Sequence, residues 1–354
     1  MKGIFTISLD FELHWGGFEK WPLRVPGSQL PVTSYQQRET YNDYFHNTRK
    51  VIPQMLSLFS QYNVHSTWAG VGMLFHSNRQ SLVENIPLQK PTYNNPKLSA
   101  YQYIDEIGIG ADENEDPFHY ASKLIDKIAA TKHQELGSHS FAHFYCNEPG
   151  QTVDQFRADL RAAQRAAAKY GVTLRSLVFP RNQFNDDYLK VCFEEGFTSV
   201  RSNPADWFWN IESTEKEGMW KRLNRGLDAY FPMGRKNTYT LSSIQVREGY
   251  PICIPASRLL RPYRPKELLL NQFKVNRILS EMESAARNGE VYHLWWHPHN
   301  FGNYPKESME GLTRILEGYQ SLKKKYGMES CTMGELTERV LSLKGVQEVK
   351  GTGT

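Results

Sequence analysis

The chain has 354 residues, of which 40% are hydrophobic and 13% aromatic, and its formal net charge is +4. This composition is typical of a globular protein, and the small charge, carried by scattered Lys and Arg, argues against a nucleic-acid partner. No run approaches the roughly 18 apolar residues that a membrane span needs.

Four well-separated cysteines, Cys146, Cys192, Cys253 and Cys331, form no CxxC pair. This favours reduced thiols over a disulfide framework or a cysteine-based zinc site. The first residues, MKGIFTISLDFELHWG, lack the long apolar core and cleavage site of a signal peptide. We therefore expect a cytoplasmic protein, with peripheral membrane contact left open and the oligomeric state undetermined.

Short apolar runs alternate with amphipathic segments, which is typical of a parallel βα architecture. Strands are predicted at 3–10, 64–74, 134–139, 174–180, 197–202, 250–257 and 290–297. Helices are predicted at about 51–62, 121–128, 152–170, 186–195, 265–288, 305–326 and 333–343. Thr152 and Gln155 fit a capping box at the start of the helix that follows them.

Two regions interrupt this alternation, residues 76–117 and residues 203–249. Unstructured stretches of that length are usually lids or insertions. With no internal repeat or linker in the chain, we expect one domain over residues 1–345 and a disordered tail at 346–354.

The first candidate site is SLDFELHW at residues 8–15. On a strand, Ser8, Asp10, Glu12 and His14 share one face, because alternate side chains point the same way. Two carboxylates at this spacing could supply a metal ligand beside a general base. The polar face of a half-solvated strand explains the same alternation equally well.

The second candidate is ELGSHSFAHF at residues 135–144, directly after a predicted strand. If His139 and His143 lie on a helical turn, both imidazoles face one side and can share a cation. HxxxH also occurs by chance, but its place at a strand end favours a site, since catalytic groups of βα barrels lie at the carboxyl ends of the strands.

Two further segments are weaker candidates. In SLVFPRNQFND (176–186), Arg181 could hold a carboxylate in a two-pronged contact or could simply face solvent. In NPADWFWN (203–210), Asp206 and Trp207 could bind a sugar, although a packed aromatic cluster is the commoner explanation.

The last candidate is HLWWHPHN at residues 293–300, which places His293, Trp295, His297 and His299 on one face. A histidine here could act as a general acid, because its ordinary pKa of about 6.5 lies close to neutrality. The alternative is a set of core histidines bonded to backbone carbonyls. Six of the eleven histidines fall in three short segments, and this convergence favours a functional site.

An acidic strand end, then HSFAH, then an Arg–Pro loop and finally LWWH resembles the polysaccharide deacetylases, the NodB-homology group of carbohydrate esterase family 4. The resemblance spans about residues 3–300 and implies a distorted (β/α)7 barrel with long loop insertions. Two features depart from the family pattern: the first motif reads DFE in place of two adjacent aspartates, and the third reads FPRN with its Arg and Pro reversed.

The resemblance also implies a mechanism and its residues. Glu12, His139 and His143 would hold a divalent metal, most simply Zn²⁺, with Asp10 as an alternative ligand to Glu12. Asp10 would be the base, Arg181 would hold Asp10, and His297 would protonate the leaving group. Trp295, His299, Trp207 and Asp206 would contact a carbohydrate or glycoconjugate substrate.

The expected activity is hydrolysis of an acetyl group from an N-acetylated or O-acetylated sugar in surface-polysaccharide biosynthesis. A related hydrolase that cleaves a C–N bond in a cyclic amide or imide is the alternative enzyme. The altered DFE motif also leaves room for a catalytically silent barrel that binds carbohydrate.

Overall fold

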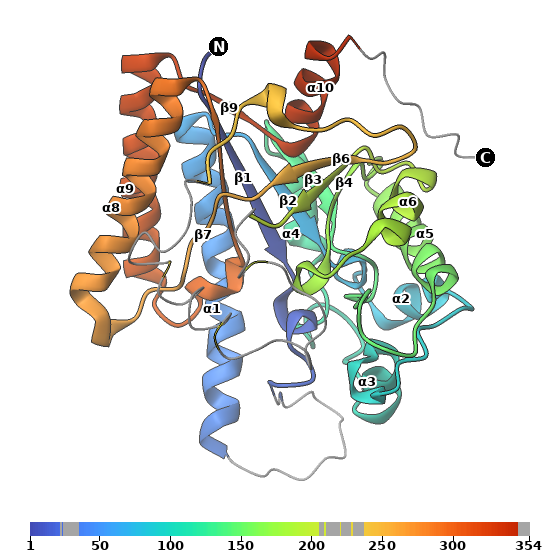
Figure 1. Cartoon of the computed structure of the whole chain (residues 1–354). Coiled ribbons are helices and arrows are strands. Elements are labelled where there is room, and N and C mark those ends of the chain that lie inside the picture. The colour runs from blue at the N-terminus through green and yellow to red at the C-terminus, as the bar shows by residue number, and fades with distance from the viewer. Residues whose placement is uncertain are drawn as a thin grey trace.

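The computed structural model describes residues 1–21, 23, 35–204, 209, 220, 228 and 237–345. Within these residues, parallel strands curl into a distorted (β/α) barrel surrounded by helices (Figure 1). The fold class predicted from the sequence is therefore confirmed. In the same part of the chain, no helix combines the length and the apolar character that a membrane crossing requires.

The elements alternate along the chain much as the sequence pattern predicts. The strands are β1 Ile4–Phe11, β2 Ser66–Gly70, β3 Gln134–Ser138, β4 Ser176–Val178, β5 Ser199–Ser202, β6 Ile252–Pro255, β7 Arg258–Leu259, β8 Val291–Trp296 and β9 Glu329–Cys331. The helices are α1 Tyr35–Tyr62, α2 Arg79–Asn85, α3 Ala100–Glu106, α4 Ser122–Ala130, α5 Val153–Ala168, α6 Asp186–Glu194, α8 Leu268–Asn288, α9 Pro305–Tyr326 and α10 Met333–Leu343.

The barrel is closed by a single stretch of chain. The strand order is β6-β5-β4-β3-β2-β1-β8-β7, so β6 and β7 lie at its two ends, yet only Ala256 and Ser257 separate them in sequence. β6 pairs with β5, and β7 pairs with β8, both in parallel. The one strand predicted over 250–257 is thus two short strands, and counting them as one gives seven strand positions along this path of the described chain.

The edge of β1 is shared by two strands. β2 pairs with the second half of β1, from Ile7 to Phe11, while β9 pairs with the first half, from Ile4 to Thr6. The sequence pattern did not indicate β9. It also overextended β2, which ends at Gly70 and gives way to a 3-10 turn at Gly72–Phe75. β9 leads directly into α10, which therefore packs near the amino ends of the strands.

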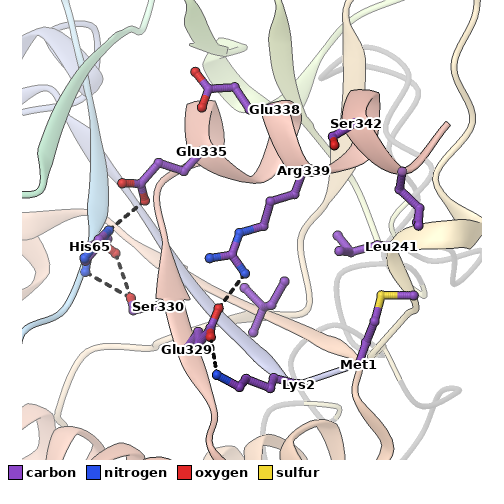
Figure 2. A pocket seen from close by; sticks show the side chains of 12 residues that line it. Met1, Lys2, His65, Leu241, Glu329, Ser330, Glu335, Glu338, Arg339 and Ser342 are labelled. Carbon is purple, nitrogen blue, oxygen red and sulfur yellow. Dashed lines mark hydrogen bonds and ion pairs between the residues drawn. The ribbon is translucent and has the colours of Figure 1, made fainter. Parts of the chain in front are cut away.

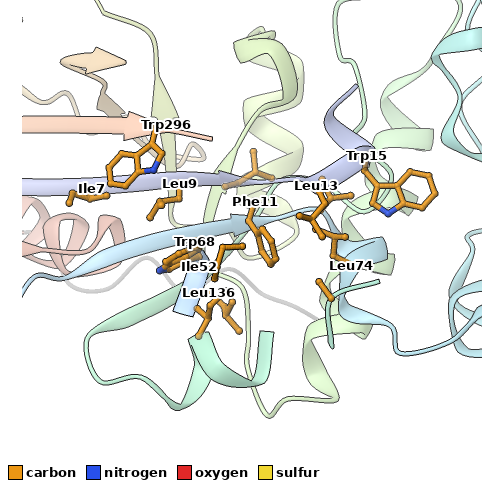
Figure 3. Close-up of a cluster of buried hydrophobic side chains, with 14 of the residues drawn as sticks. Ile7, Leu9, Phe11, Leu13, Trp15, Ile52, Trp68, Leu74, Leu136 and Trp296 are labelled. Atoms are coloured by element: carbon orange, nitrogen blue, oxygen red, sulfur yellow. The ribbon is translucent and has the colours of Figure 1, made fainter. Parts of the chain in front are cut away.

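The apolar core lies between the strands and the surrounding helices (Figure 3). Trp68 on β2 meets Phe11 on β1 edge to face at 6.3 Å between ring centroids, and Trp296 on β8 meets Phe59 on α1 at 6.3 Å. Burying side chains of this size contributes about 1.5–3 kcal/mol each. Because strand side chains alternate, these outward residues leave the opposite face of β1 and β8 free for polar groups.

Several local predictions are confirmed in detail. α9 and α10 have the predicted bounds, and Thr152 and Gln155 form the expected capping box at the start of α5. Residues 76–117 contain α2 and α3, and their assignment as an insertion stays a prediction. Within residues 203–249, positions 205–208, 210–219, 221–227 and 229–236 lie outside the described residues.

Candidate active site

The polar residues of β1 point into the barrel near its carboxyl end. Ser8 and Asp10 lie on the strand, and Glu12 follows directly after it. All three side chains are buried, and Asp10 and Glu12 expose 2% and 4% of their surface. Buried carboxylates need partners that offset the loss of hydration, and each of these two has a different set.

Glu12 is the centre of a histidine cluster. Its Oε1 lies 2.8 Å from His139 Nε2 and 3.2 Å from His143 Nε2. One ligand atom from each of the three residues falls within 4.8 Å of the others, and all three side chains are buried. The structure therefore brings together the acid of the first motif and both histidines of HSFAH.

The HSFAH segment, residues 139–143, is a loop, so the prediction of a helical turn is wrong. Its shape depends on Asp159 of α5, which accepts hydrogen bonds from the backbone N–H of Phe141 at 2.6 Å and of Ala142 at 3.0 Å. His143 has a left-handed backbone with φ of 54°. The two imidazoles converge because the loop folds back on α5 rather than because of helical spacing.

The outer nitrogens of both histidines also have partners. His139 donates from Nδ1 to the carbonyl of Val178 at 2.8 Å, and His143 Nδ1 lies 3.0 Å from the hydroxyl of Tyr145. Such contacts fix the orientation and tautomer of metal-binding imidazoles. With its proton on Nδ1, neutral His139 directs an Nε2 lone pair at Glu12 Oε1, a contact that is favourable only with a proton or a cation between them. Two imidazoles and a carboxylate form a donor set suited to zinc, so the residues fit such an ion.

Asp10 is held by an arginine that the sequence analysis missed. Arg201 of β5 donates from Nη1 to Oδ1 of Asp10 at 2.5 Å and from Nη2 to Oδ2 at 2.8 Å. The same guanidinium also donates to Ser8 and Asn182 and lies 4.1 Å from the ring centroid of Trp295. The sequence did contain a signal for this pair, namely a single arginine within the strand predicted over 197–202. A guanidinium buried in a strand requires an anionic partner.

The prediction that Arg181 holds Asp10 is wrong. Arg181 forms ion pairs with Glu19 and with Glu148, the latter at 3.4 Å, and stacks 3.9 Å from the ring centroid of Tyr145. The physical reason is its position in a turn with a left-handed backbone, φ 54°, directly after Pro180. That turn directs the side chain to Tyr145, whose hydroxyl contacts His143, instead of to Asp10.

The histidines of HLWWHPHN have two different surroundings: His293 is buried behind Asp10, whereas His297 and His299 lie against the carboxylates. The Nε2 of His293 lies 2.9 Å from Ser8 Oγ and its Nδ1 lies 3.1 Å from the carbonyl of Pro255. Burial, and then nearby Arg201, lowers the pKa of His293 to about 3, so its ring is neutral. His293 therefore matches the core-histidine alternative.

His297 and His299 lie against the carboxylates. His297 Nε2 is 3.6 Å from both Asp10 Oδ2 and Glu12 Oε1, and its side chain is about one-quarter exposed. His299 Nδ1 lies 3.8 Å from Glu12 Oε2, and within the described residues it has no hydrogen-bond partner. Burial lowers the pKa of His299 to about 3. His297 is thus the imidazole that both touches the acids and remains open to solvent.

His14 leaves the site, contrary to the expectation that it shares the face of Glu12. β1 ends at Phe11, and the next residues form a 3-10 turn, so strand alternation stops before His14. Its Nδ1 lies 2.8 Å from His119 Nε2 and its Nε2 lies 2.6 Å from the carbonyl of Trp21. The other nitrogen of His119 lies 2.7 Å from Asp116, which completes a buried polar row.

The sequence-predicted substrate residues are only partly described. Asp206 and Trp207 lie outside the described residues. Trp295 is nearly buried and meets Trp209 at 6.4 Å between ring centroids. Trp295 therefore supports Arg201 from one side and packs against Trp209 on the other.

The surrounding charges keep both carboxylates ionised. Burial alone would raise the pKa of Asp10, but Arg201 and then His297 outweigh it and lower the value. Burial would likewise raise the pKa of Glu12, yet His297, His139 and His143 hold it well below its usual range. The site thus presents two carboxylates side by side. Asp10 is paired with the guanidinium of Arg201, and Glu12 is surrounded by imidazoles.

Comparisons with known proteins define the fold. No family model matches the chain, and no curated sequence matches it significantly. Among solved structures, it resembles a protein described as a polysaccharide deacetylase from Mycobacterium smegmatis, with 13% identity, a TM-score of 0.56, and coverage of 98% of this chain and 93% of that one. The chain therefore has the barrel fold of the polysaccharide deacetylases, and the resemblance expected from its motifs is confirmed at that level.

Two other enzymes share this fold. The PuuE allantoinase is 12% identical with a TM-score of 0.51, over 98% of this chain and 91% of that one. The α-amylase AmyC from Thermotoga maritima is 11% identical with a TM-score of 0.53, over 99% of this chain and 76% of that one. The fold alone therefore does not define a reaction.

Proposed function

We propose that this chain is a metal-dependent hydrolase that removes an acetyl group from an N-acetylated or O-acetylated sugar or glycoconjugate. The observation that carries the proposal is the meeting of Glu12, His139 and His143 within 4.8 Å, beside Asp10 paired with Arg201. Asp10 and Glu12 lie at the carboxyl end of β1 and the two histidines directly after β3, where catalytic groups of βα barrels lie, and Arg201 comes from β5.

In this proposal Glu12, His139 and His143 hold the ion, most simply Zn²⁺. When bound, zinc supplies Lewis-acid chemistry, because it acidifies water and polarises a carbonyl oxygen. The supporting geometry is that each histidine presents Nε2 to the same carboxylate oxygen, while its Nδ1 is engaged elsewhere.

Asp10 takes the role of general base. Arg201 leaves it ionised and fixed in orientation, so Asp10 can accept a proton from the attacking water. His297 takes the role of general acid and delivers a proton to the departing sugar amine or alkoxide. Its place 3.6 Å from both carboxylates and its partial exposure suit a group that meets substrate.

The substrate in this proposal is a biosynthetic sugar, such as a lipid- or nucleotide-linked precursor of a surface glycan, and the protein acts in the cytoplasm as one domain. Trp295 and His299 border the site, and Asp206 and Trp207 complete the sugar contacts. The deacetylase-like motifs HSFAH and LWWH support this choice of substrate class.

The test is acetate release by zinc-loaded protein from a panel of N-acetylated and O-acetylated sugars, with metal content measured on the same samples. We expect activity that is lost on chelation and restored by zinc, and we expect His139→Ala to lose both metal and activity. Full activity after chelation would contradict the proposal. Saturable glycan binding without turnover would indicate the silent barrel instead.

The alternative is a hydrolase that opens a cyclic amide or imide. It is favoured by the similarity of the fold to the PuuE allantoinase over almost the whole of both chains. Asp10, the Glu12 cluster and His297 would keep the same roles, since ring opening and N-deacetylation both break a bond between a carbonyl carbon and nitrogen. Ring opening of a hydantoin without acetate release from any sugar would establish this alternative.

A further inference from the structure

A second histidine cluster lies at the opposite end of the barrel, where the strands begin. His65 and His133 directly precede β2 and β3, and the pairing of Ser66 with Gln134 makes the two histidines neighbours across the strands. Glu335, in the first turn of α10, points toward His65 (Figure 2). Three segments far apart in sequence therefore meet at a place that the proposed reaction does not use.

The side chains are in close contact. The rings of His65 and His133 stack with 3.9 Å between centroids and 9° between planes, and His65 Nδ1 lies 2.7 Å from Glu335 Oε2. One ligand atom from each residue falls within 4.8 Å of the others. Around a tetrahedral zinc ion with bonds of about 2.0–2.2 Å, ligand atoms stand roughly 3.3 Å apart. To bind one ion, the two rings must turn out of this parallel stack, because the lone pair of an imidazole nitrogen lies in the plane of its ring.

Contacts with the backbone hold His65 and Glu335 in place, and for Glu335 they include the carboxylate oxygen Oε2, which accepts from the backbone N–H of Thr332 at 2.9 Å. Ser330 Oγ accepts from the backbone N–H of His65 at 2.9 Å, and Glu335 belongs to a capping box with Thr332. His133 has a left-handed backbone with φ of 64°, a conformation that costs a non-glycine residue energy and that is enriched at functional sites. This conformation places its ring over His65.

The donor set is chemically suited to zinc. Two imidazoles and one carboxylate bind zinc in many proteins, and binding requires neutral imidazoles. Stacked rings also repel one another when both carry protons, and a shared ion removes that repulsion.

The cluster is accessible from solvent. The side chains of His65 and Glu335 expose 15% and 40% of their surface, and both line a cavity of about 640 Å³ that Arg339 also borders (Figure 2). We propose that His65, His133 and Glu335 form a second zinc site, which fastens α10 to the amino ends of β2 and β3. The cavity would admit water to an ion held there.

The experiment counts zinc ions in the purified full-length chain after dialysis against zinc, and repeats the count for variants. We expect two ions per chain in the wild type, one in His65→Ala, one in His139→Ala and none in the double variant. Glu335→Gln should weaken the second site at least tenfold, although glutamine still serves the capping box. Glu338→Gln, one turn further along α10, is the matched control and should keep both ions.

A second readout guards against misfolding. Zinc should raise the melting temperature of His139→Ala but not that of the double variant, while the zinc-free proteins should melt alike. If the wild type and His65→Ala bind equal numbers of ions, the second site does not exist. If the proposed catalytic site alone fails, the wild type binds one ion that His65→Ala loses and His139→Ala keeps, so the two failures are distinguishable.

Discussion

Arg201 and Asp10 are 191 residues apart in sequence, yet they form a two-pronged ion pair inside the barrel with nitrogen–oxygen distances of 2.5 and 2.8 Å. Both side chains are almost fully buried. The pair fixes the position of Asp10 and keeps it ionised beside Glu12. If Asp10 is the base, Arg201 is its positioning residue.

Replacement of Arg201 should therefore impair turnover and stability separately. Arg201→Lys keeps a charge but loses the two-pronged contact, and we expect turnover to fall about 10²-fold through misplacement of the base. Arg201→Ala leaves Asp10 without its buried partner and should lower the free energy of unfolding by about 3–5 kcal/mol. Acetate release and urea unfolding measure the two effects.

The control for this pair is Arg247→Lys, because Arg247 forms an exposed ion pair with Asp186. Pairs of that kind contribute about 0–1 kcal/mol, so neither measurement should change noticeably. A loss of turnover in Arg181→Lys with none in Arg201→Lys would restore the assignment made from the sequence.

Asp10 and Glu12 should differ in what their removal abolishes. Glu12→Gln takes away the carboxylate that both His139 and His143 face, so we expect loss of bound zinc together with activity. Asp10→Asn should retain zinc at the Glu12 cluster and lose turnover alone. Metal analysis and acetate release on the same samples check this. If Asp10→Asn lost zinc and Glu12→Gln kept it, Asp10 would be the metal ligand and Glu12 the base.

His297 should matter most where the leaving group is poor. Loss of a general acid typically reduces the rate 10²–10⁴-fold, so His297→Gln should be severely impaired on an N-acetyl sugar. An aryl acetate needs little help from an acid, because its phenolate leaves readily, and should be hydrolysed at nearly the wild-type rate. Equal losses on both substrates would instead assign His297 to metal binding.

Asp159 should make the stability of the HSFAH loop depend on pH. Burial raises the pKa of Asp159 to about 7, above its ordinary value of 3.8. The folded chain then binds this proton more tightly than the unfolded chain, so the contribution of Asp159 to stability is full below about pH 4 and declines as pH rises to about 7.

The variant that tests this is Asp159→Asn. One of the two backbone N–H donors loses its acceptor, which should cost about 1–3 kcal/mol. The stability difference between wild type and variant should shrink between about pH 4 and pH 7, as urea unfolding can measure. Asp126→Asn changes an exposed acid on α4 and serves as the control; a difference independent of pH would refute the titration of Asp159.

Local patterns predicted the fold well where a single element determined the outcome. The bounds of α9 and α10 and the capping box of α5 follow from periodicity and from residues three apart, which are local properties. The split of the strand over 250–257 could not be predicted, because it depends on β6 and β7 finding different neighbours at the two ends of the sheet.

The motifs predicted the metal-binding residues of the site. The residues that contact them from distant parts of the sequence were not predicted. Glu12, His139 and His143 lie together as expected, but the loop that joins the two histidines is shaped by Asp159, which lies outside the motif. Arg201 was overlooked because Arg181 stood beside a motif-like proline, while Arg201 stood in an ordinary strand. Only the three-dimensional arrangement shows which arginine reaches Asp10.

The buried row from Asp116 through His119 and His14 to the carbonyl of Trp21 has a consequence for proton number. Each of its three hydrogen bonds requires one hydrogen. The carbonyl of Trp21 can only accept, and two neutral imidazoles together bring only two hydrogens. A third hydrogen must reside there. Burial and then His119 lower the pKa of His14 to about 3, so the extra hydrogen belongs to the His119–Asp116 end. The row is therefore electrically neutral. Removal of this hydrogen by a strong base would break one of the three hydrogen bonds that anchor the first loop after β1.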